Sequence, residues 1–438
     1  MIATRPSLAA DRDVHPLQAL IERHKAGAPV GVTSVCSAHS LVIEATLDHA
    51  RRRDLPLVLI EATSNQVNQD GGYTGMTPTT FHEFVSAIAD RVAYPREQVL
   101  LGGDHLGPNA WTALPAEEAM IKAEVMVAEY AAAGFGKIHL DCSMHCADDP
   151  DVLSETVIAT RAARLCKAAE TAAATAGFPP PVYVFGTEVP VPGGAAEDLD
   201  QLAVTRPEAM RATLDIHRAT FVDHGLAAAW PRVIATVVQP GVEFDHDKVI
   251  DFVPDLARDL SQAIEAVEHI VYEAHSTDYQ TGAALAALVR DHFAILKVGP
   301  AVTFALREAL WALDMIEGET IAEADRAGLR RTTLATMRAD PKYWRAYYHE
   351  EGPALDRQLQ YSLSDRIRYY WPDPRIVAAQ ERLFANLRAT PPSLPLLSQY
   401  LPSAHGAVRA GEASLDPIEL VMAHIAATLD VYRHACHG

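Results

Sequence analysis

The sequence predicts a (β/α)₈ TIM barrel followed by a helical C-terminal extension. Three observations predict it. Eight short apolar runs recur along the first 300 residues, helical patterns separate them, and nearly every run ends in polar side chains. Apolar strands that alternate with helices are typical of a parallel sheet covered by helices, and eight such units indicate a closed barrel. An open doubly wound sheet is the rival, but it usually has fewer strands and a glycine-rich nucleotide loop.

The predicted strands are short segments rich in Val, Ile and Leu. They span residues 29–37, 56–63, 98–107, 137–144, 181–189, 233–240, 269–276 and 293–300. Ala-, Leu- and Glu-rich segments with helical spacing lie between them, for example at 40–53, 117–134 and 154–176. We therefore predict that residues 1–318 form a TIM barrel with an N-terminal helix.

Residues 319–438 have a different composition, which is richer in Arg, Tyr, Trp and Pro. Helical spacing returns at 375–388 and 416–434, on either side of a proline-rich stretch. We predict that this segment is a helical extension that packs on the barrel, in a position to cover its mouth.

The composition excludes several classes of protein. With 438 residues and 49% hydrophobic side chains, the chain can bury a large core. Its formal net charge of −20 argues against nucleic-acid binding, which needs clustered Lys and Arg. The five cysteines are few and odd in number, the N-terminus lacks a signal-peptide pattern, and no run of about 18 apolar residues occurs. We therefore expect a cytoplasmic protein without membrane or nucleic-acid partners, and we expect it to form a homo-oligomer.

Polar side chains stand at the end of nearly every predicted strand. They are Ser37, His39, Glu61, Ser64, Asp104, His105, Asp141, His145, Glu188, Gln239, His275, Ser276 and Lys297. In a barrel the C-terminal ends of the strands converge on one mouth, where catalytic residues lie. A single polar residue at a strand end can be a cap, but a set of this size predicts an active site.

The motif GGDHLGPN at 102–109 is the most specific indication of a catalytic site. Asp104 and His105 would point in opposite directions if the strand stayed extended, so that one could ligate a metal while the other serves as a base. The motif YEAHSTDYQTG at 272–282 adds His275 as a nitrogen ligand. The structural alternatives are a hydrogen-bonded His–Asp turn for the first motif and a helix N-cap for the second.

A phosphate site is predicted after the seventh and eighth strands, where barrels commonly hold phosphate. The residues in that place are Ser276, Thr277, Asp278 and Gly299. Arg366 and Arg368, in the segment SDRIRYYW, could reach over the mouth and clamp a phosphate. The same arginines could instead form the solvated face of an amphipathic helix.

Three further segments carry polar side chains that could line the mouth. In HLDCSMH, strand alternation puts His139 and Asp141 on one face. Asp141 could orient a ligand or bind a substrate hydroxyl, whereas His139 lies deeper and is expected in the core. Glu188 is a carboxylate on the fifth strand, ahead of a tight turn. The loop 61–75, which contains Asn65, is rich in amides and hydroxyls and suits a polyol ligand, although a plain solvated loop would have the same composition.

Seven motifs together resemble one known family. They are GGDHLGPN, HLDCSMH, TEVPVPGG, VVQPG, YEAHSTDYQTG, LKVGP and YSLSDRIRYYW. Over essentially its whole length the chain resembles the non-catalytic subunits of tagatose-bisphosphate aldolase. Some members of that family carry the name tagatose-6-phosphate kinase, and others are described as D-tagatose 6-phosphate 4-epimerases. The family is related to the class II, metal-dependent aldolases.

The resemblance implies roles for individual residues. Asp104 corresponds to a catalytic acid/base, and His105 and His275 correspond to metal ligands. Asp141 and Glu188 match a strand-four Asp and a strand-five Glu, and we expect both to take part in catalysis. Besides the phosphate-binding residues named above, the residues expected to bind substrate are Glu61, Asn65, Gln239 and Lys297.

The implied cofactor is a divalent metal ion, zinc in the first place, with manganese, nickel and magnesium as alternatives. Gln239 stands where the class II aldolases have their third metal-binding histidine. This departure favours a different third ligand, a different metal or a lost activity.

The resemblance leaves three functions to compare. We expect an epimerase that interconverts D-tagatose 6-phosphate and D-fructose 6-phosphate, because a barrel without chemistry need not keep so many ionisable groups at its mouth. The alternative is a non-catalytic partner that stabilises a separate catalytic aldolase subunit. A kinase is the third, but no Walker or protein-kinase nucleotide motif is present.

Overall fold

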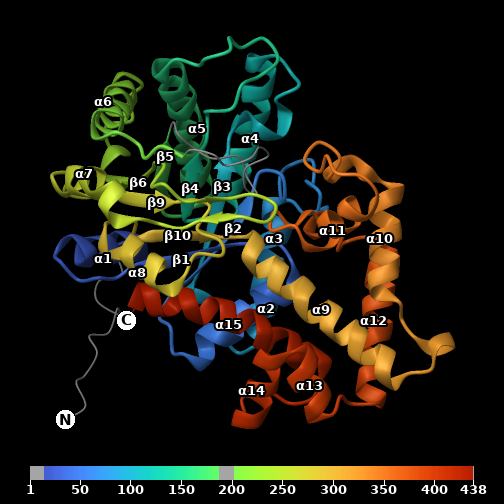
Figure 1. Cartoon of the computed structure of the whole chain (residues 1–438). Coiled ribbons are helices and arrows are strands. Elements are labelled where there is room, and N and C mark those ends of the chain that lie inside the picture. Colours follow the sequence, from blue (N-terminus) through green and yellow to red (C-terminus); the bar gives the residue numbers. More distant parts are fainter. Residues whose placement is uncertain (1–13, 187–201, 438) are drawn as a thin grey trace, which may run out of the picture.

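The computed structural model describes residues 14–186 and 202–437, and at its centre eight parallel strands close into a barrel (Figure 1). Around the barrel the strands follow the order β1-β10-β9-β6-β5-β4-β3-β2. Their bounds are β1 Val32–Cys36, β2 Val58–Thr63, β3 Val99–Leu106, β4 Lys137–Leu140, β5 Val182–Gly186, β6 Val233–Val237, β9 Val271–Ala274 and β10 Ile295–Val298. The predicted barrel is confirmed, and each strand lies within one of the eight predicted segments.

A short antiparallel hairpin between β6 and β9 was not predicted. Its strands are β7 (Glu243–Phe244) and β8 (Val249–Ile250), with Glu243 opposite Ile250. Strands of two residues are too short to show an alternating pattern in the sequence. The hairpin matters for the site because it brings Phe244 to the mouth of the barrel.

Helices cover the outside of the barrel between successive strands (Figure 1). They are α2 Ser40–Arg52, α3 Pro78–Arg91, α4 Ala116–Ala132, α5 Glu155–Ala176, α6 Pro207–Asp223, α7 Pro254–Glu265 and α8 Gly282–Arg290. Local sequence sets their ends. The Ser154 hydroxyl accepts a hydrogen bond from the Val157 amide at the start of α5, and Gly177 takes a left-handed conformation (φ 78°) at its end. His39, predicted as a polar strand end, caps α2 through its Nδ1.

The first helix, α1 (Pro16–Lys25), closes the N-terminal end of the barrel. Its residues Leu17, Leu20 and Ile21 share an apolar cluster with the first residues of four barrel strands. Those strand residues are Val32, Val182, Val271 and Ile295. Since this end of the barrel is filled with apolar side chains, polar chemistry is confined to the opposite end.

Seven helices follow β10. They are α9 Pro300–Thr320, α10 Leu329–Ala339, α11 Gly352–Tyr361, α12 Pro374–Ala389, α13 Leu394–Tyr400, α14 Pro402–Ala410 and α15 Pro417–His437. The last of them, α15, packs against α2, α8 and α9, and the Cys436 carbonyl accepts a hydrogen bond from the Gly31 amide just before β1. This helix therefore lies in the wall of the barrel, and α9 runs through the boundary expected at residue 318. Among the described residues, no helix has both the length and the apolar character to cross a membrane.

Candidate active site

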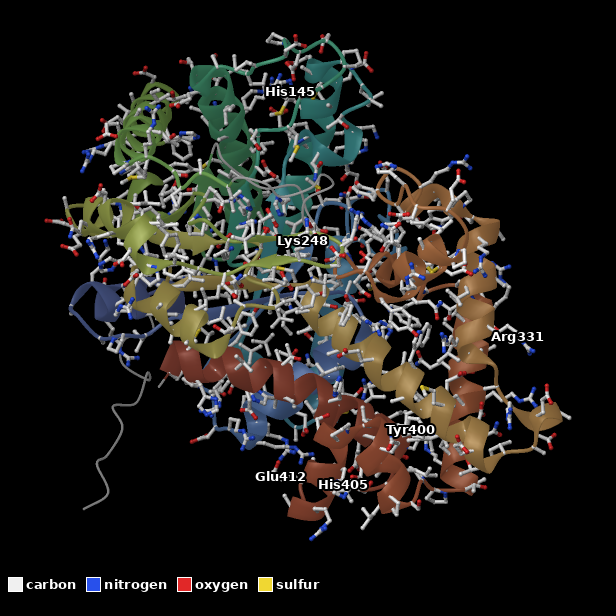
Figure 2. All side chains as sticks on the ribbon, in the orientation of Figure 1. His145, Lys248, Arg331, Tyr400, His405 and Glu412 are labelled. Atoms are coloured by element: carbon white, nitrogen blue, oxygen red, sulfur yellow. The ribbon has the colours of Figure 1, made fainter. Side chains whose placement is uncertain are left out.

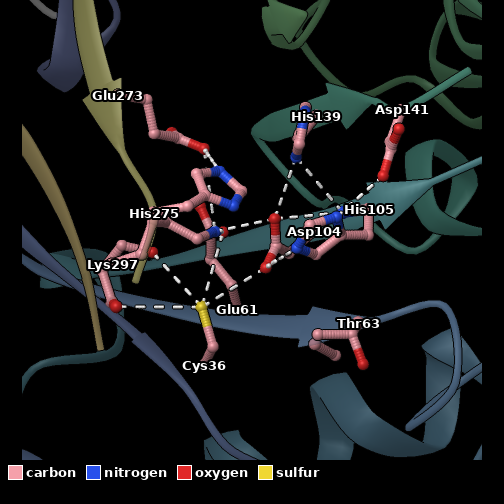
Figure 3. Close-up of polar contacts among 12 residues, drawn as sticks. Cys36, Glu61, Thr63, Asp104, His105, His139, Asp141, Glu273, His275 and Lys297 are labelled. Atoms are coloured by element: carbon pink, nitrogen blue, oxygen red, sulfur yellow. Dashed lines mark hydrogen bonds and ion pairs between the residues drawn. The ribbon is translucent and has the colours of Figure 1, made fainter. Parts of the chain in front are cut away.

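Ionisable side chains from five strands meet inside the mouth of the barrel (Figure 3). They come from β2, β3, β4, β9 and β10, and they are Glu61, Asp104, Lys137, His139, Glu273 and Lys297, with His105, Asp141 and His275 beside them. All nine are buried. Burying this many ionisable groups is costly unless they are paired, and such clusters are typical of functional sites.

Strand β3 contains a bulge that turns two adjacent residues into the mouth. Its pairing with β4 shifts register between Gly103 and Leu106, and His105 has a φ of 48°. A positive φ is uncommon for a residue with a side chain and is often found at functional sites. An extended strand would have pointed Asp104 and His105 apart, but the bulge lets both line the same cavity.

Two glycines of the motif at 102–109 make room for the cluster. A Cβ at Gly102 would lie 2.7 Å from the Glu61 carboxylate, and a Cβ at Gly107 would lie 1.6 Å from the Asp141 carbonyl oxygen. The motif is therefore glycine-rich because neighbouring strands bring polar groups against its backbone.

The two lysines neutralise the carboxylates by direct ion pairs. Lys137 Nζ lies 2.5 Å from Glu61 Oε1 and 2.7 Å from Glu273 Oε2, and Lys297 Nζ lies 2.9 Å from Asp104 Oδ1 and also contacts Glu61. Burial favours the neutral amine of Lys297, but the carboxylates around it raise its pKa well above the ordinary value. The mouth therefore holds ammonium groups and carboxylates rather than neutral acids and amines.

The histidines of the cluster differ in charge. His105 Nδ1 lies 2.8 Å from Asp141 Oδ2. Burial lowers the pKa of His105, but Asp104 and Asp141 outweigh it and raise the pKa above the ordinary value. His275 is different, because burial lowers its pKa to about 3. His105 is therefore a proton donor held by Asp141, and His275 is a neutral imidazole whose Nε2 lies 3.0 Å from Glu273 Oε1.

Four of these residues fit a divalent metal ion. The ligand atoms of Asp104, His139, Glu273 and His275 all lie within 4.8 Å of one another, and all four side chains are buried. His139 Nε2 is buried without a hydrogen-bond partner among the described residues. Two imidazoles and two carboxylates are a donor set that suits zinc and other first-row divalent ions. His105, which we expected as a ligand, is not among these four donors.

A cavity opens directly above the cluster. Asp104, His105, His275 and Lys297 form part of its lining, and the side chains of Cys36 and Phe244 complete that part. Neutral polar groups line another part, namely Thr63, Asn65, Gln66 and Tyr73. Ser276, Asp278, Gly299, Arg368 and Tyr369 line the remainder. The cavity lining therefore combines ionised groups with hydroxyl, amide and guanidinium donors.

Comparisons with known proteins show the family to which this chain belongs. Residues 17–437 match the model of the family described as D-tagatose-1,6-bisphosphate aldolase subunit GatZ/KbaZ-like. The chain belongs to this family. A crystal structure described as a probable tagatose 6-phosphate kinase from Sinorhizobium meliloti 1021 is 49% identical with a TM-score of 0.85, over 93% of this chain and 100% of that one.

Two other structures are similar only at a distance. A fructose-bisphosphate aldolase from Campylobacter jejuni is 13% identical, with a TM-score of 0.44, over 85% of this chain and 92% of that one. The fructuronate-tagaturonate epimerase UxaE from Cohnella laeviribosi is also 13% identical, with a TM-score of 0.47, over 92% of this chain and 82% of that one. Neither likeness carries an argument about this chain.

Several residues predicted for the site lie outside the cavity of this GatZ/KbaZ-like chain. Glu61 lies beneath the cavity, bound to the two lysines. Gln239 folds back on its own turn, where its Oε1 accepts hydrogen bonds from the Gly241 and Val242 amides. Thr277 is buried, and its carbonyl accepts a hydrogen bond from the Tyr432 hydroxyl.

The remaining residues that were predicted for the site also lie outside the lining of this cavity or outside the described residues. Asp141 does not line the cavity but holds His105. Arg366 lines a neighbouring cavity instead of this one. Glu188 lies outside the described residues. His145 is exposed and lies beside α4 and α5, away from the cluster (Figure 2).

Sequence reasoning missed Lys137, Glu273 and the role of His139. The signal was present, because Lys137 and His139 alternate on β4 as Glu273 and His275 do at the end of β9. A buried strand that carries ionisable groups at every second position presents one charged face. Tyr73 gave no such signal, because it comes from a loop and reaches the cavity only through tertiary packing.

Glu243 of β7, beside the cavity, should make stability depend on pH. It is 5% exposed, and burial raises its pKa to about 7. A raised pKa in the folded state stabilises the protein fully below the unfolded value near 4.5, and this stabilisation is lost as the pH rises through 7. We expect Glu243→Gln to remove about 3 kcal/mol of pH-dependent stability between pH 4.5 and pH 8, measured by urea unfolding. Glu118→Gln at an exposed position is the control; an equal change in both variants would contradict the assignment.

Proposed function

We propose that this protein is a C4 epimerase that interconverts D-tagatose 6-phosphate and D-fructose 6-phosphate. The observation that carries the proposal is the cavity itself. It joins an ionised Asp104, the Lys297 ammonium and a candidate metal site to a wall of neutral amides and hydroxyls. A phosphorylated ketohexose needs these features together, namely a base, a positive charge near its carbonyl end, and donors for its hydroxyl and phosphate oxygens.

The position of carbon 4 relative to the carbonyl decides by which reaction C4 can be inverted. Carbon 4 of a 2-ketose is not adjacent to the carbonyl, so its proton is not acidic enough for direct removal. Loss of the O4 proton instead lets the C3–C4 bond break, which leaves an enediolate and an aldehyde. If the aldehyde turns over before the enediolate carbon attacks it again, the C3–C4 bond re-forms with C4 inverted, and the proton returns to O4. No atom is gained or lost.

Asp104 is the residue proposed to move the O4 proton. Burial alone would raise its pKa, but the charges of His105 and Lys297 and a hydrogen bond from His139 hold that pKa well below the ordinary value. Asp104 is therefore a carboxylate, able to accept the proton and return it. The Lys297 ammonium, 2.9 Å from Asp104, lies where it can stabilise the negative charge of the enediolate oxygens.

The phosphate is proposed to lie by Ser276, Gly299 and Arg368, which also line the cavity. Arg368 donates hydrogen bonds to the Ser364 and Asp365 carbonyls and to the Tyr369 hydroxyl rather than to a carboxylate. Its charge is therefore available to a dianion. Asp278 accepts the Gly299 and Ala301 amides, so those amides hold the loop rather than the phosphate.

A divalent metal ion is the proposed cofactor, with Asp104, His139, Glu273 and His275 as the residues that would hold it. Such an ion would supply Lewis-acid polarisation of the sugar oxygens. Zinc is the first candidate on the family resemblance, and the mixed imidazole and carboxylate donors are also compatible with manganese or nickel.

The metal assignment predicts different behaviour for two kinds of histidine variant. We expect His139→Ala combined with His275→Ala to lose most bound metal, because both nitrogen donors are removed. His105→Ala should keep its metal, because His105 is bound to Asp141 and lies outside the donor set. Metal content per chain, measured by elemental analysis after equilibration with zinc, checks this. Loss of metal in the His105 variant alone would assign the ligand role to His105.

The function itself is tested by incubating the purified full chain with D-tagatose 6-phosphate and a divalent metal. We expect D-fructose 6-phosphate to appear up to an equilibrium ratio, without release of triose phosphate. A parallel reaction with ATP tests the kinase activity that the similar structure's description names. Formation of a bisphosphate, or no reaction in either arm, would overturn the proposal.

The second candidate is a stabilising subunit of a tagatose-1,6-bisphosphate aldolase, favoured by the family description. It predicts no turnover by the chain alone. It also predicts a longer activity half-life of a catalytic aldolase when the chain is added. The Asp104→Asn variant separates the two functions, since a purely stabilising subunit should not need that carboxylate.

A further inference from the structure

A second cavity adjoins the first, and the proposed function does not use it. We call it the tyrosine cavity, after Tyr73, Tyr343, Tyr347 and Tyr369, which line it together with Lys342 and Arg366. Its volume is about 440 Å³. Asn65, Tyr73 and Tyr369 belong to the lining of both cavities, so the two are separated only by side chains.

Arg366 is the unusual residue of this cavity. Its side chain is 3% exposed, and its Nε and Nη2 are buried without a hydrogen-bond partner among the described residues. Its guanidinium stacks on the Tyr347 ring, 3.2 Å from the ring centroid, and reaches the Tyr369 hydroxyl only at 3.5 Å. Buried guanidinium groups normally find a carboxylate, as Arg161 does with Asp149. Within the described chain, no carboxylate forms an ion pair with Arg366.

The surroundings of Arg366 are electropositive. Burial raises the pKa of Tyr369, but the charges of Arg368 and Arg366 outweigh it, so that the pKa lies below the ordinary value. Lys342 lies at the rim, 4.7 Å from the Tyr343 ring centroid and 3.0 Å from Asp340. The cavity lining contains one carboxylate, Asp70, which is ion-paired with Lys122 at 3.2 Å. Positive charge is therefore concentrated on the Arg366 side of the cavity, in a chain of net charge −20.

We propose that the tyrosine cavity is a binding site for an oxyanion of the phosphate class, with Arg366 as its principal cation. An oxyanion would supply acceptors for the two unpaired guanidinium nitrogens, and the tyrosine hydroxyls could donate to its remaining oxygens. Because the Arg366 side chain is buried, each hydrogen bond that its guanidinium makes to an oxyanion is stronger than it would be in water. The proposal goes beyond the proposed function, which puts its single phosphate near Arg368 in the first cavity.

Arg307 offers a matched control. It is also 3% exposed, its Nε and Nη2 are also without a partner among the described residues, and it stacks on Phe304 with 3.9 Å to the ring centroid. However, it lines neither cavity. If a buried, stacked guanidinium is merely structural in this protein, Arg307 and Arg366 should behave alike.

The test is calorimetric titration of the full chain with inorganic phosphate. We expect Arg366→Met to weaken one phosphate site by about 10- to 100-fold, as expected for the loss of a charged hydrogen-bonding partner. Arg307→Met should leave every phosphate site unchanged. Arg366→Lys keeps the charge without the planar fork and should give an intermediate loss of about tenfold, which keeps the test valid if the Met variant fails to fold.

Titration of Arg368→Met separates this proposal from the proposed function. One site lost in each single variant supports both phosphate positions. Loss only in the Arg366 variant supports the tyrosine cavity and removes the proposed phosphate position in the first cavity. Unchanged phosphate binding in both Arg366 variants, or an equal effect of Arg307→Met, would overturn the oxyanion site.

A final titration identifies the source of the oxyanion. If it is a second phosphoryl group of the same ligand, a ketohexose 1,6-bisphosphate should displace phosphate from both sites at one molecule per chain. If it is a separate ion, the bisphosphate should displace phosphate from the first cavity only and leave the phosphate in the tyrosine cavity bound. In the first case the displacement from the tyrosine cavity should depend on Arg366.

Discussion

Replacing Asp104 with asparagine is expected to abolish epimerisation while the barrel remains folded. An amide keeps the size of the carboxylate and can still accept the hydrogen bond from His139, but it cannot take up the O4 proton. General acid–base catalysis contributes about 100- to 10,000-fold, so kcat should fall by that factor. The KM for D-tagatose 6-phosphate should change far less, because the lost role exists mainly in the transition state. Steady-state kinetics with matched metal content in the two proteins makes this measurement.

Comparing Asp104→Asn with Glu188→Gln shows which of the two carboxylates transfers the O4 proton. Glu188, which the sequence predicts as a carboxylate on the fifth strand, lies outside the described residues. If Asp104→Asn turns over at near-normal rates and Glu188→Gln does not, the proton transfer belongs to Glu188. Asp104 is also one of the four proposed metal donors, so a loss of metal that accounts for the whole fall in kcat would show instead that this carboxylate acts mainly as a ligand.

Replacing Lys137 with methionine should have the largest effect on stability. Its ammonium is completely buried between Glu61 and Glu273, so the variant leaves two buried carboxylates short of a cation. Removing one partner of a buried ion pair costs about 3–5 kcal/mol. We expect the free energy of unfolding to fall by that amount in urea denaturation, or the variant to be insoluble.

Two further variants show whether this loss has an electrostatic cause. Adding Glu273→Gln to Lys137→Met should restore part of the stability, because one uncompensated carboxylate is removed. Lys122→Met provides the surface control. Its ion pair with Asp70 joins side chains that are 42% and 56% exposed, so its loss should cost less than about 1 kcal/mol. A Lys137 variant as stable as the Lys122 variant would contradict the assigned ion pairs.

The barrel could be predicted from sequence because its parallel strands are buried on both faces and read as near-continuous apolar runs. The burial of these strands also explains why the role of His139 was not predicted. His139 lies in the middle of the four-residue strand β4, so it was expected in the core. It is indeed fully buried, but the barrel core at this level is charged rather than apolar. Neighbouring strands supply the partner charges, and a single strand does not reveal them.

The bulge in β3 and the separation of the two arginines were also beyond sequence reasoning. A one-residue bulge depends on how β3 pairs with β4, which the pattern of one strand does not specify. Arg366 and Arg368 belong to a short 3₁₀ helix, Arg366–Tyr369, rather than an α-helix. Residues two positions apart point to different sides of either kind of helix, so the packing of this segment decides which cavity each arginine meets. One arginine therefore faces the first cavity, and the other faces the tyrosine cavity.

The position of α15 has a consequence for how the protein folds. The hydrogen bond from Gly31 to Cys436 and the packing of α15 on α2 join segments about 400 residues apart. Contacts at such separation form late, because the entropy of closing the intervening loop must be overcome first. Until α15 docks, the faces of α2 and α8 that it covers remain exposed as apolar surface. Folding intermediates of this barrel should therefore be prone to aggregation and should be natural clients of chaperones.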